Sequence, residues 1–388
     1  MDFRATPEQQ AIKAAVRDLC AKYPDAYWRD LDRRSAYPDE FVRALTNAGW
    51  LAALIPTEYG GAGLGMAEAS LILEEINASG GNAASAHAQM YTMGTLLRHG
   101  SETQKKRILP RLAKGDLRLQ AFGVTEPEAG SETTRIKTFA RRDGDRYVVN
   151  GKKIFISRTL QSDLLLLLAR TTPYDELTDK TQGLSVFLVD LKAAVAAGTI
   201  KISPIETMLN HHTTELFIDG LVLRPADLVG TEGQGFRHII DSWNAERILI
   251  ASESLGDGRW FVERASRYAS ERVVFGRPIG ANQGVQFPIA QAHAELVAAG
   301  LVRDKAAWLF DHGEPCGDEA NTAKLLASQA AWAAGNAAMD TFGGYAYAKE
   351  FDIERKFRET RLFLTAPVSN NLVLAYIAEH VLGLPRSY

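Results

Sequence analysis

The 388-residue chain contains few cysteines and no long apolar run. Its two cysteines, Cys20 and Cys316, lie far apart, which excludes a disulfide framework and any C-x-x-C redox or zinc motif. The longest purely apolar run, residues 164–169, is far shorter than the roughly 20 residues that span a membrane. The first residues show no basic-then-apolar signal layout. These absences predict a cytoplasmic protein without a membrane segment.

A surplus of basic residues is also lacking. The net charge of −3 and the pI near 6.3 give no electrostatic reason to expect nucleic-acid binding. No G-x-S-x-G, H-E-x-x-H or Walker A motif occurs, and no G-x-G-x-x-G lies between a strand and a helix. The glycine cluster at residues 59–65 is most simply a loop. His211 and His212 are adjacent, so they would point to opposite sides of an extended chain, and no metal site is predicted.

Local signals divide the chain into three segments in the order α, β, α. Thr6, Pro7 and Gln9 form a capping box at a helix start, and residues 38–49 and 66–81 show helical patterns that end at glycine. Short β-rich runs follow, at residues 119–124, 147–149, 152–157, 163–169, 184–190 and 215–223. The Asn150-Gly151 pair predicts a hairpin turn between two of these runs.

Long alanine-rich helical patterns then occupy residues 286–313 and 321–344 and suit a tightly packed helical bundle. We therefore predict an N-terminal α-helical domain (residues 1–118), a middle antiparallel β-barrel or β-sandwich domain (119–230) and a C-terminal α-helical bundle (231–388).

One acidic side chain interrupts an apolar helix face in the stretch DSWNAERILIA, residues 241–251. At helical spacing Ile239, Trp243, Glu246 and Ile250 share a face. Burial would raise the proton affinity of Glu246 and neighbouring Arg247 would lower it, which is the tuning expected of a catalytic base. The alternative is a buried glutamate that an arginine holds for structural reasons, and spacing alone leaves both open.

A second candidate is the stretch FGVTEPEAGSE, residues 122–132. It joins strand residues to a polar turn that carries Thr125, Gly130 and Ser131. Hydroxyls and free N–H groups in such a turn can hold a phosphate or the edge of a heteroaromatic ring. By composition alone the stretch is only a turn.

Together with GKKIFIS, ERVVFGRPIGANQ and DTFGGYAY, these motifs resemble the acyl-CoA dehydrogenase family in the right order and over nearly the whole chain. The resemblance implies an FAD-dependent oxidoreductase whose C-terminal domain is a four-helix bundle. It implies that Ser157 lies near flavin N5 and that Ser131, Asn244 and Arg247 bind substrate. The implied FAD contacts are Phe122, Val124, Thr125, Gly130, Ser131, Phe155, Ile156, Ser157, Arg272, Phe275, Gln283, Asp340, Gly343, Gly344, Ser369 and Asn371. Phe155 stands where many members have Trp, and Asp340 stands where several members have Gln.

The resemblance also implies a reaction and partners. Glu246 would remove the α-proton of an acyl-CoA thioester while the β-hydride passes to flavin N5, and an electron-transfer flavoprotein would reoxidise the cofactor. Arg272, Phe275 and Gln283 would reach the FAD of a neighbouring subunit, which implies a homo-oligomer, with a tetramer built from dimers as the expectation. The position of the base is similar to that of isovaleryl- and long-chain acyl-CoA dehydrogenases, so a short or branched acyl chain is expected.

One position departs from the family pattern. Pro367 stands where most members carry the catalytic glutamate, and proline supplies neither a carboxylate nor a backbone N–H for the thioester oxygen. Two alternatives therefore remain open: the same fold with FAD and acyl-CoA catalyses elimination or reduction, or it is a CoA-binding protein without catalytic activity. His87, Gln89, Met90 and Met93 lie on a predicted helix either as acyl-pocket residues or as ordinary packing.

Overall fold

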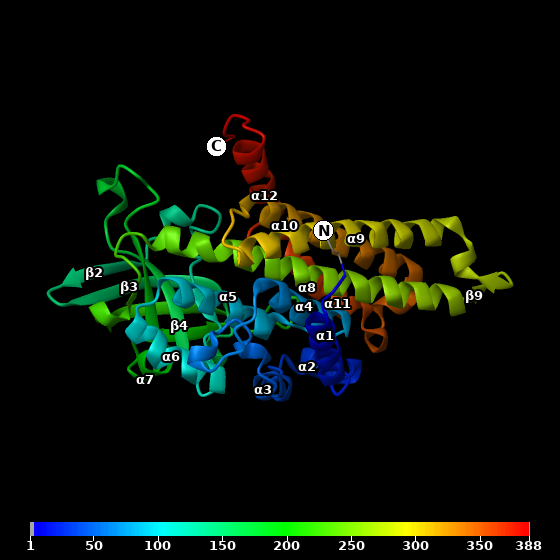
Figure 1. The fold of residues 1–388 in the computed structure, drawn as a ribbon, viewed down its shortest axis with the longest axis horizontal. Coiled ribbons are helices and arrows are strands. Elements are labelled where there is room, and N and C mark those ends of the chain that lie inside the picture. Colours follow the sequence, from blue (N-terminus) through cyan, green and yellow to red (C-terminus); the bar gives the residue numbers. More distant parts are fainter. Residues whose placement is uncertain (1–3, 388) are drawn as a thin grey trace. The chain divides into compact units, whose positions relative to one another are not determined.

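Two compact units make up the computed structural model, which describes residues 4–387. Unit 1 comprises the described residues of Met1–Ala44, Leu64–Ala83 and Asn244–Tyr388, and unit 2 comprises Leu45–Gly63 and Ala84–Trp243. Figure 1 labels their elements. No helix within residues 4–387 is long and apolar enough to cross a membrane.

Unit 1 is helical. Its elements are α1 (Pro7–Cys20), α2 (Asp25–Arg34), α3 (Asp39–Asn47, which runs into unit 2), α4 (Met66–Ala78), α8 (Gly235–Glu271, which begins in unit 2), β9 (Val273–Val274), β10 (Arg277–Pro278), α9 (Gln283–Asp311), α10 (Gly317–Phe342), α11 (Ile353–Arg361) and α12 (Asn370–Tyr376). The expected capping box at Thr6 and Gln9 is confirmed, with Pro7 as the first residue of α1.

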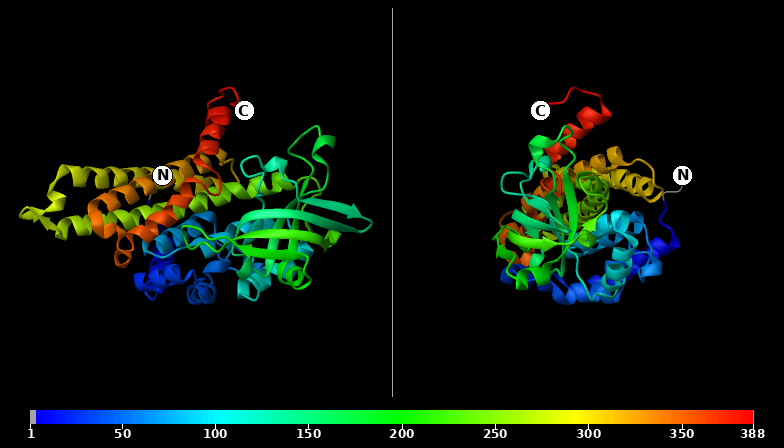
Figure 2. Two further views of the ribbon diagram at one scale, coloured as in Figure 1. Left: turned by 180° about the vertical axis from the view of Figure 1, so that it is seen from behind. Right: turned by 90° about the vertical axis from the view of Figure 1, so that its left-hand side faces the viewer.

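The long helices of unit 1 lie side by side as a bundle. Figure 2 shows α9 and α10 running along the unit 1 part of α8. Their shared core is built largely from alanines, including Ala292, Ala299, Ala327 and Ala334, together with Phe261 and Leu296. Small side chains let helix backbones approach closely, so the alanine-rich pattern in the sequence correctly indicated a tight bundle.

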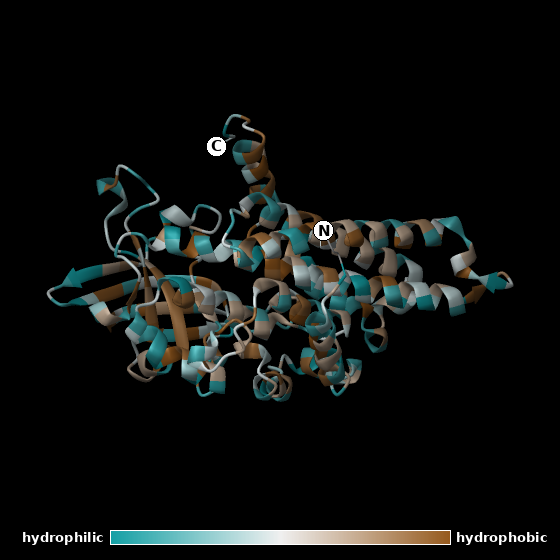
Figure 3. Ribbon diagram, viewed as in Figure 1, coloured by the Kyte–Doolittle hydropathy of each residue, from teal (hydrophilic) through white to brown (hydrophobic). Residues whose placement is uncertain are grey.

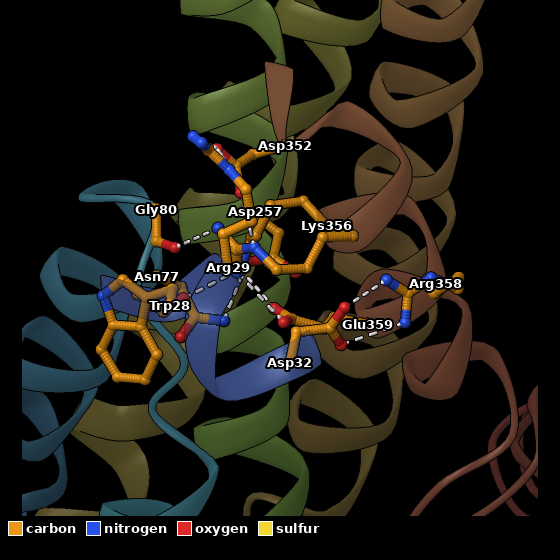
Figure 4. Close-up of polar contacts among 12 residues, drawn as sticks. Trp28, Arg29, Asp32, Asn77, Gly80, Asp257, Asp352, Lys356, Arg358 and Glu359 are labelled. Atoms are coloured by element: carbon orange, nitrogen blue, oxygen red, sulfur yellow. Dashed lines mark hydrogen bonds and ion pairs between the residues drawn. The ribbon is translucent and has the colours of Figure 1, made fainter. Parts of the chain in front are cut away.

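A buried charge network ties four helices of unit 1 together (Figure 4). Lys356 on α11 forms an ion pair with Asp257 on α8 (2.5 Å) and another with Glu359 (3.1 Å). Asp257 also accepts hydrogen bonds from Asn77 on α4 and from Thr360. Arg29 on α2 forms an ion pair with buried Asp352, which precedes α11. Charges this deeply buried are stable only as a complete set.

Unit 2 contains the sheet. Its elements are α5 (Ala84–His99), α6 (Glu102–Lys114), β1 (Ala121–Gly123), β2 (Phe139–Asp143), β3 (Arg146–Ser157), β4 (Leu164–Arg170), β5 (Leu184–Asp190), α7 (Leu191–Ala196), β6 (Ile200–Pro204), β7 (Thr213–Leu223) and β8 (Leu228–Val229). The strands pair in the order β6-β7-β3-β2-β4-β5-β8, and β1 pairs with β4.

The sheet has apolar side chains on both faces. Leu166 and Leu168 of β4 join one core cluster with residues of α5 and α6, whereas Leu165 and Leu167 join a second cluster inside the β-domain. Figure 3 shows the resulting band of apolar residues along the central strands. Burial on both faces explains why β4 reads as an unbroken apolar run rather than as an alternating one.

Two sequence predictions about the sheet are wrong in detail. The pairings β1–β4 and β2–β4 are parallel, so the sheet is not antiparallel throughout. Asn150-Gly151 is no hairpin turn, because β3 runs on through residue 157 and its pairing with β7 shifts register between Val149 and Gly151. The Asn150 Oδ1 accepts a hydrogen bond from the Gly220 N–H (2.8 Å), and a Cβ on Gly151 would lie 2.3 Å from the Thr138 Oγ1. The extra residue lies on β7, where Asp219 and Gly220 stand opposite Asn150, so the pair belongs to a continuous strand that faces a bulge.

Candidate functional site

Glu246 lies on a buried face of α8, as its sequence pattern predicts. The Glu246 side chain is 7% exposed, and Ile239 and Ile250 on the same stripe are buried. Arg247 is buried beside it, and its Nη1 donates to the Asn244 Oδ1 (3.3 Å). Burial lowers the pKa of Arg247, and the Glu246 carboxylate opposes that shift. The buried position of the carboxylate is confirmed, while its role as a base stays a prediction.

A buried lysine accompanies this pair in unit 1. Lys324 on α10 is 0% exposed, and its Nζ donates to the Val368 carbonyl (2.7 Å) and to the Asn370 Oδ1 (2.6 Å). Burial, together with the positive charge of Arg247, lowers the pKa of Lys324 to about 7. Lys324 was not among the residues predicted from the sequence.

The segment before α12 contains Pro367. It follows the 3-10 turn Leu362–Leu364 and includes a cis Ala366–Pro367 peptide bond. Ser369 caps α12, because its side chain accepts a hydrogen bond from the Leu372 N–H (3.4 Å). The half-buried Pro367 offers no N–H here, as the sequence indicated.

A cleft of about 640 Å³ lies beside this segment within unit 1. The predicted FAD contacts Ser369 and Asn371 line it. Its other lining residues are Gln329, Trp332, Ala333, Asn336, Arg361, Leu364, Thr365 and Asn370. Trp332 stacks on Phe357 (ring centroids 4.3 Å apart), and the Arg361 guanidinium lies 5.5 Å from the Trp332 ring. Amides, hydroxyls, a guanidinium and an indole suit a ligand with anionic and aromatic parts.

The α10 residues of this cleft were missed by the sequence analysis. Gln329, Trp332 and Asn336 recur at helical spacing of three and four residues, which could have marked a polar face on an alanine-rich helix. The expected contact Asp340 is exposed one turn further along α10.

The other predicted contacts of unit 1 lie beyond the ends of α8 and α10. Arg272 directly precedes the β9–β10 hairpin, and Phe275 lies in its turn, fully exposed with a positive φ of 51°. Gln283 begins α9 and is exposed. Gly343 and Gly344 begin the turn that carries Tyr345, whose ring lies 6.0 Å from the Arg272 guanidinium. The structure thus brings Arg272, directly before the hairpin, close to Tyr345 of the Gly343–Gly344 turn.

In unit 2, a buried ion pair shapes the turn at residues 122–131. The Glu126 carboxylate accepts hydrogen bonds from the Lys153 Nζ (2.8 Å) and from the backbone N–H groups of Lys137 (2.5 Å) and Thr138 (2.9 Å). The Lys153 Nζ also donates to the Val124 carbonyl (2.9 Å). Burial lowers the pKa of Lys153 to about 8, and Glu126 opposes that shift. Phe122 is buried, Val124 and Thr125 are half-buried, and Gly130 and Ser131 are exposed.

The end of β3 has an unusual backbone. Phe155 (φ 58°) and Arg158 (φ 58°) lie in the left-handed region, and Phe155 is 62% exposed. The opposite strand is preceded by His212 (φ 51°), whose carbonyl accepts from the Arg158 N–H (2.9 Å). The register shifts between Lys153 and Ile156, so the strand bulges directly before the predicted contacts Ile156 and Ser157. Non-glycine residues with positive φ gather at binding sites, where the strain has a purpose.

The remaining candidates have plainer explanations. His87, Gln89, Met90 and Met93 are all buried on α5, which both the packing and the acyl-pocket interpretations allow. No group of three or more potential metal ligands occurs within residues 4–387. In the glycine cluster, a Cβ on Gly61 would lie 2.1 Å from the Ile55 carbonyl oxygen, which supports a structural role.

Comparisons with known proteins decide the family. Family models described as the N-terminal, middle and C-terminal domains of acyl-CoA dehydrogenase match residues 6–116, 121–221 and 233–382. The chain belongs to the acyl-CoA dehydrogenase family. The predicted family, the α, β, α organisation, FAD as cofactor and oxidoreductase activity of the acyl-CoA dehydrogenase type are therefore confirmed.

Individual relatives cover almost the whole chain. Acyl-CoA dehydrogenase FadE12 of Mycobacterium tuberculosis is 37% identical, over 100% of this chain and 99% of that protein. A 3-(aryl)acrylate reductase of Clostridium sporogenes is 31% identical, over 97% of this chain and 99% of that protein. The structure of a glutaryl-coenzyme A dehydrogenase with glutaryl-CoA is 31% identical with a TM-score of 0.91, covering 100% of this chain and 98% of that one. The family thus includes a protein named as a reductase.

The residues present fit FAD. The cleft of unit 1 offers hydrogen-bond donors, a guanidinium and an aromatic ring, as phosphates and a nucleotide base require. The bulge of β3 exposes an aromatic side chain at the position implied for the flavin ring. The cleft and the exposed aromatic side chain are thus both compatible with FAD, the cofactor of the acyl-CoA dehydrogenase family.

Proposed function

We propose that the protein desaturates a short or branched acyl-CoA between Cα and Cβ, with Glu246 as the base. The observation that carries the proposal is a carboxylate buried in an apolar stripe beside Arg247, in a chain that has Pro367 where most members carry glutamate. The buried position keeps bulk water from the carboxylate that would take the proton.

The chain's own residues divide the work. Glu246 takes the α-proton, and Arg247 with Asn244 holds Glu246 and the CoA part of the substrate in place. Bound FAD would supply the acceptor for the hydride that leaves Cβ. Ser131 contributes a hydroxyl to substrate and cofactor. The exposed Arg272 and Phe275 support the proposal of a homo-oligomer in which the hairpin reaches a neighbouring subunit's FAD.

The cofactor contacts proposed here follow the family motifs. In unit 2 they are Phe122, Val124, Thr125, Gly130, Ser131, Phe155, Ile156 and Ser157. In unit 1 they are Arg272, Phe275, Gln283, Asp340, Gly343, Gly344, Ser369 and Asn371. An electron-transfer flavoprotein is the proposed acceptor of the electrons. The acyl class rests on analogy with members that place their base on the same helix.

A second candidate is reduction or elimination on an unusual acyl-CoA. Pro367 favours it, because the family's thioester carbonyl loses one N–H donor there, and one oxyanion donor is worth on the order of a hundred- to a thousand-fold in rate. The relative named as a reductase also supports it.

Anaerobic mixing of the FAD-loaded protein with straight, branched and polar acyl-CoAs distinguishes the two candidates. Desaturation predicts loss of flavin absorbance and a product lighter by two hydrogens in mass spectrometry. Spectral shifts without bleaching would contradict it. If none of the acyl-CoAs bleaches the flavin, but an enoyl-CoA rapidly oxidises the flavin of pre-reduced protein, the protein is the reductase instead.

A further inference from the structure

Lys324 is a buried cation that the proposed reaction does not use. It stands on the alanine-rich helix α10 between buried Ala323 and Leu325, and its side chain is 0% exposed. An unpaired ammonium at such a depth is costly, so the groups that contact it deserve a functional explanation.

The ammonium holds two points on one short segment. Its Nζ donates to the Val368 carbonyl (2.7 Å) and to the Asn370 Oδ1 (2.6 Å), the two residues that flank Ser369. The Asn370 side chain is also fixed by Ser328, because the Asn370 Nδ2 donates to the Ser328 Oγ (3.1 Å). Ser369, Asn370 and Asn371 line the cleft, so Lys324 supports that wall from behind.

The charged group that acts on Lys324 is positive. Arg247 on α8 disfavours the ammonium form of Lys324, and Glu246, Tyr376 and Cys316 act in turn on Arg247. The two acceptors of the ammonium are neutral oxygens. Burial lowers the pKa of Lys324 to about 7, so the residue changes charge near neutral pH. An anion bound in the cleft would favour the charged form.

We propose that Lys324 is a positioning residue for the phosphate-bearing part of FAD: it holds the Ser369–Asn371 wall of the cleft and takes up a proton when the anionic cofactor binds. The inference rests on the proposed cofactor contacts of Ser369 and Asn371. By linkage, a site that takes up one proton on binding loses affinity as the pH rises through the pKa of that site, by at most tenfold per pH unit. FAD affinity therefore falls between pH 6 and pH 8.5.

The test is a titration of the cofactor-free protein with FAD, followed by quenching of flavin fluorescence, at pH 6, 7 and 8.5. Wild type is expected to bind FAD at least about fivefold more weakly at pH 8.5 than at pH 6. Lys324→Met is expected to bind at least tenfold more weakly than wild type at pH 6, with little further change up to pH 8.5. Lys305→Met, which removes an exposed lysine on α9, keeps the wild-type profile.

A second variant protects the test against misfolding of Lys324→Met. Asn370→Asp keeps the lysine but gives it a carboxylate partner, which holds the proton at pH 8.5 and flattens the profile. If either folded variant shows the wild-type pH dependence of FAD affinity, the inference is overturned. It is also overturned if a variant binds FAD more weakly than wild type by the same factor at every pH. Wild type that binds no FAD at any pH contradicts the cofactor assignment itself, which is a separate failure.

Discussion

At the residue scale, the informative positions are charged side chains at places that the local pattern reserves for apolar ones. Glu246 was recognised in this way from the sequence. The same reasoning would have found Lys324, which stands in an alanine-rich helix, and Lys153, which is fully buried in a strand. Their partners could not be predicted, because Val368, Asn370 and Glu126 lie far from them in the sequence.

Lys153 gives a prediction at this scale. Lys153→Met leaves the Glu126 carboxylate buried without a counter-charge, although two backbone N–H groups still bind it. We expect a loss of about 3 kcal/mol in the free energy of unfolding, at the low end for a broken buried pair, and weaker FAD binding because the Val124–Glu126 turn loosens. Urea unfolding and FAD titration measure both. The control Lys152→Met changes the exposed neighbouring residue and should alter the free energy of unfolding by less than about 0.5 kcal/mol. An equal effect in both variants would contradict a stabilising role for the Lys153–Glu126 ion pair.

At the element scale, helix starts and stops were well predicted, whereas strand continuity was not. Thr6 and Gln9 signal a helix start by a local hydrogen-bond pattern that the sequence carries in full. Asn150-Gly151 has the composition of a tight turn, but contacts with the tertiary partners Thr138 and Gly220 place it inside a continuous strand, opposite a bulge in β7. The left-handed Phe155 likewise depends on the pairing of β3 with β7 and has no sequence signal.

Two stacked histidines join α5 to the start of α8 within unit 2 and predict a pH effect. His99 and His238 stack at 4.3 Å, and the His99 Nε2 lies 3.3 Å from the Asp241 Oδ2. Burial lowers the pKa of both rings: Asp241 opposes this at His99, whereas His99 reinforces it at His238. Because the folded pKa values are depressed, the stability they give is present above the unfolded value of about 6.5 and is lost as the pH falls through the folded values.

Urea unfolding between pH 7.5 and pH 5 measures this effect. We expect wild type to lose more stability over that range than His238→Gln. His293→Gln, at an exposed position, should follow wild type. Parallel curves for wild type and His238→Gln would show that the stack does not titrate in this range.

At the scale of the whole molecule, the order of helical and sheet segments and the family follow from the sequence, because turn signals, apolar periodicity and family motifs are local. The grouping into two units was not predicted: unit 1 draws on three separate stretches, and no local signal marks such long-range association. The three-domain boundaries at residues 118 and 230 therefore stay a prediction. Contacts such as Arg29 with Asp352 show how far apart in the sequence the partners lie.

The buried network of unit 1 predicts a large effect on stability. Lys356→Met leaves Asp257 and Glu359 without their shared ammonium, whereas wild type keeps the pKa of Asp257 at about 6, raised by burial and restrained by Lys356. We expect a loss of roughly 3–5 kcal/mol in the free energy of unfolding. Arg33→Met removes an exposed pair with Asp30 and should cost less than about 1 kcal/mol. Similar losses in the two variants would contradict a structural role for the network.

The central claim is that Glu246 removes the α-proton. The most direct test is rapid anaerobic mixing of FAD-loaded protein with the acyl-CoA that best bleaches wild type. It compares wild type, Glu246→Gln and the control Glu263→Gln, which changes an exposed glutamate on the same helix. The account predicts that Glu246→Gln binds FAD normally but bleaches at least a thousand-fold more slowly, while Glu263→Gln matches wild type. Bleaching of Glu246→Gln at the wild-type rate would contradict it.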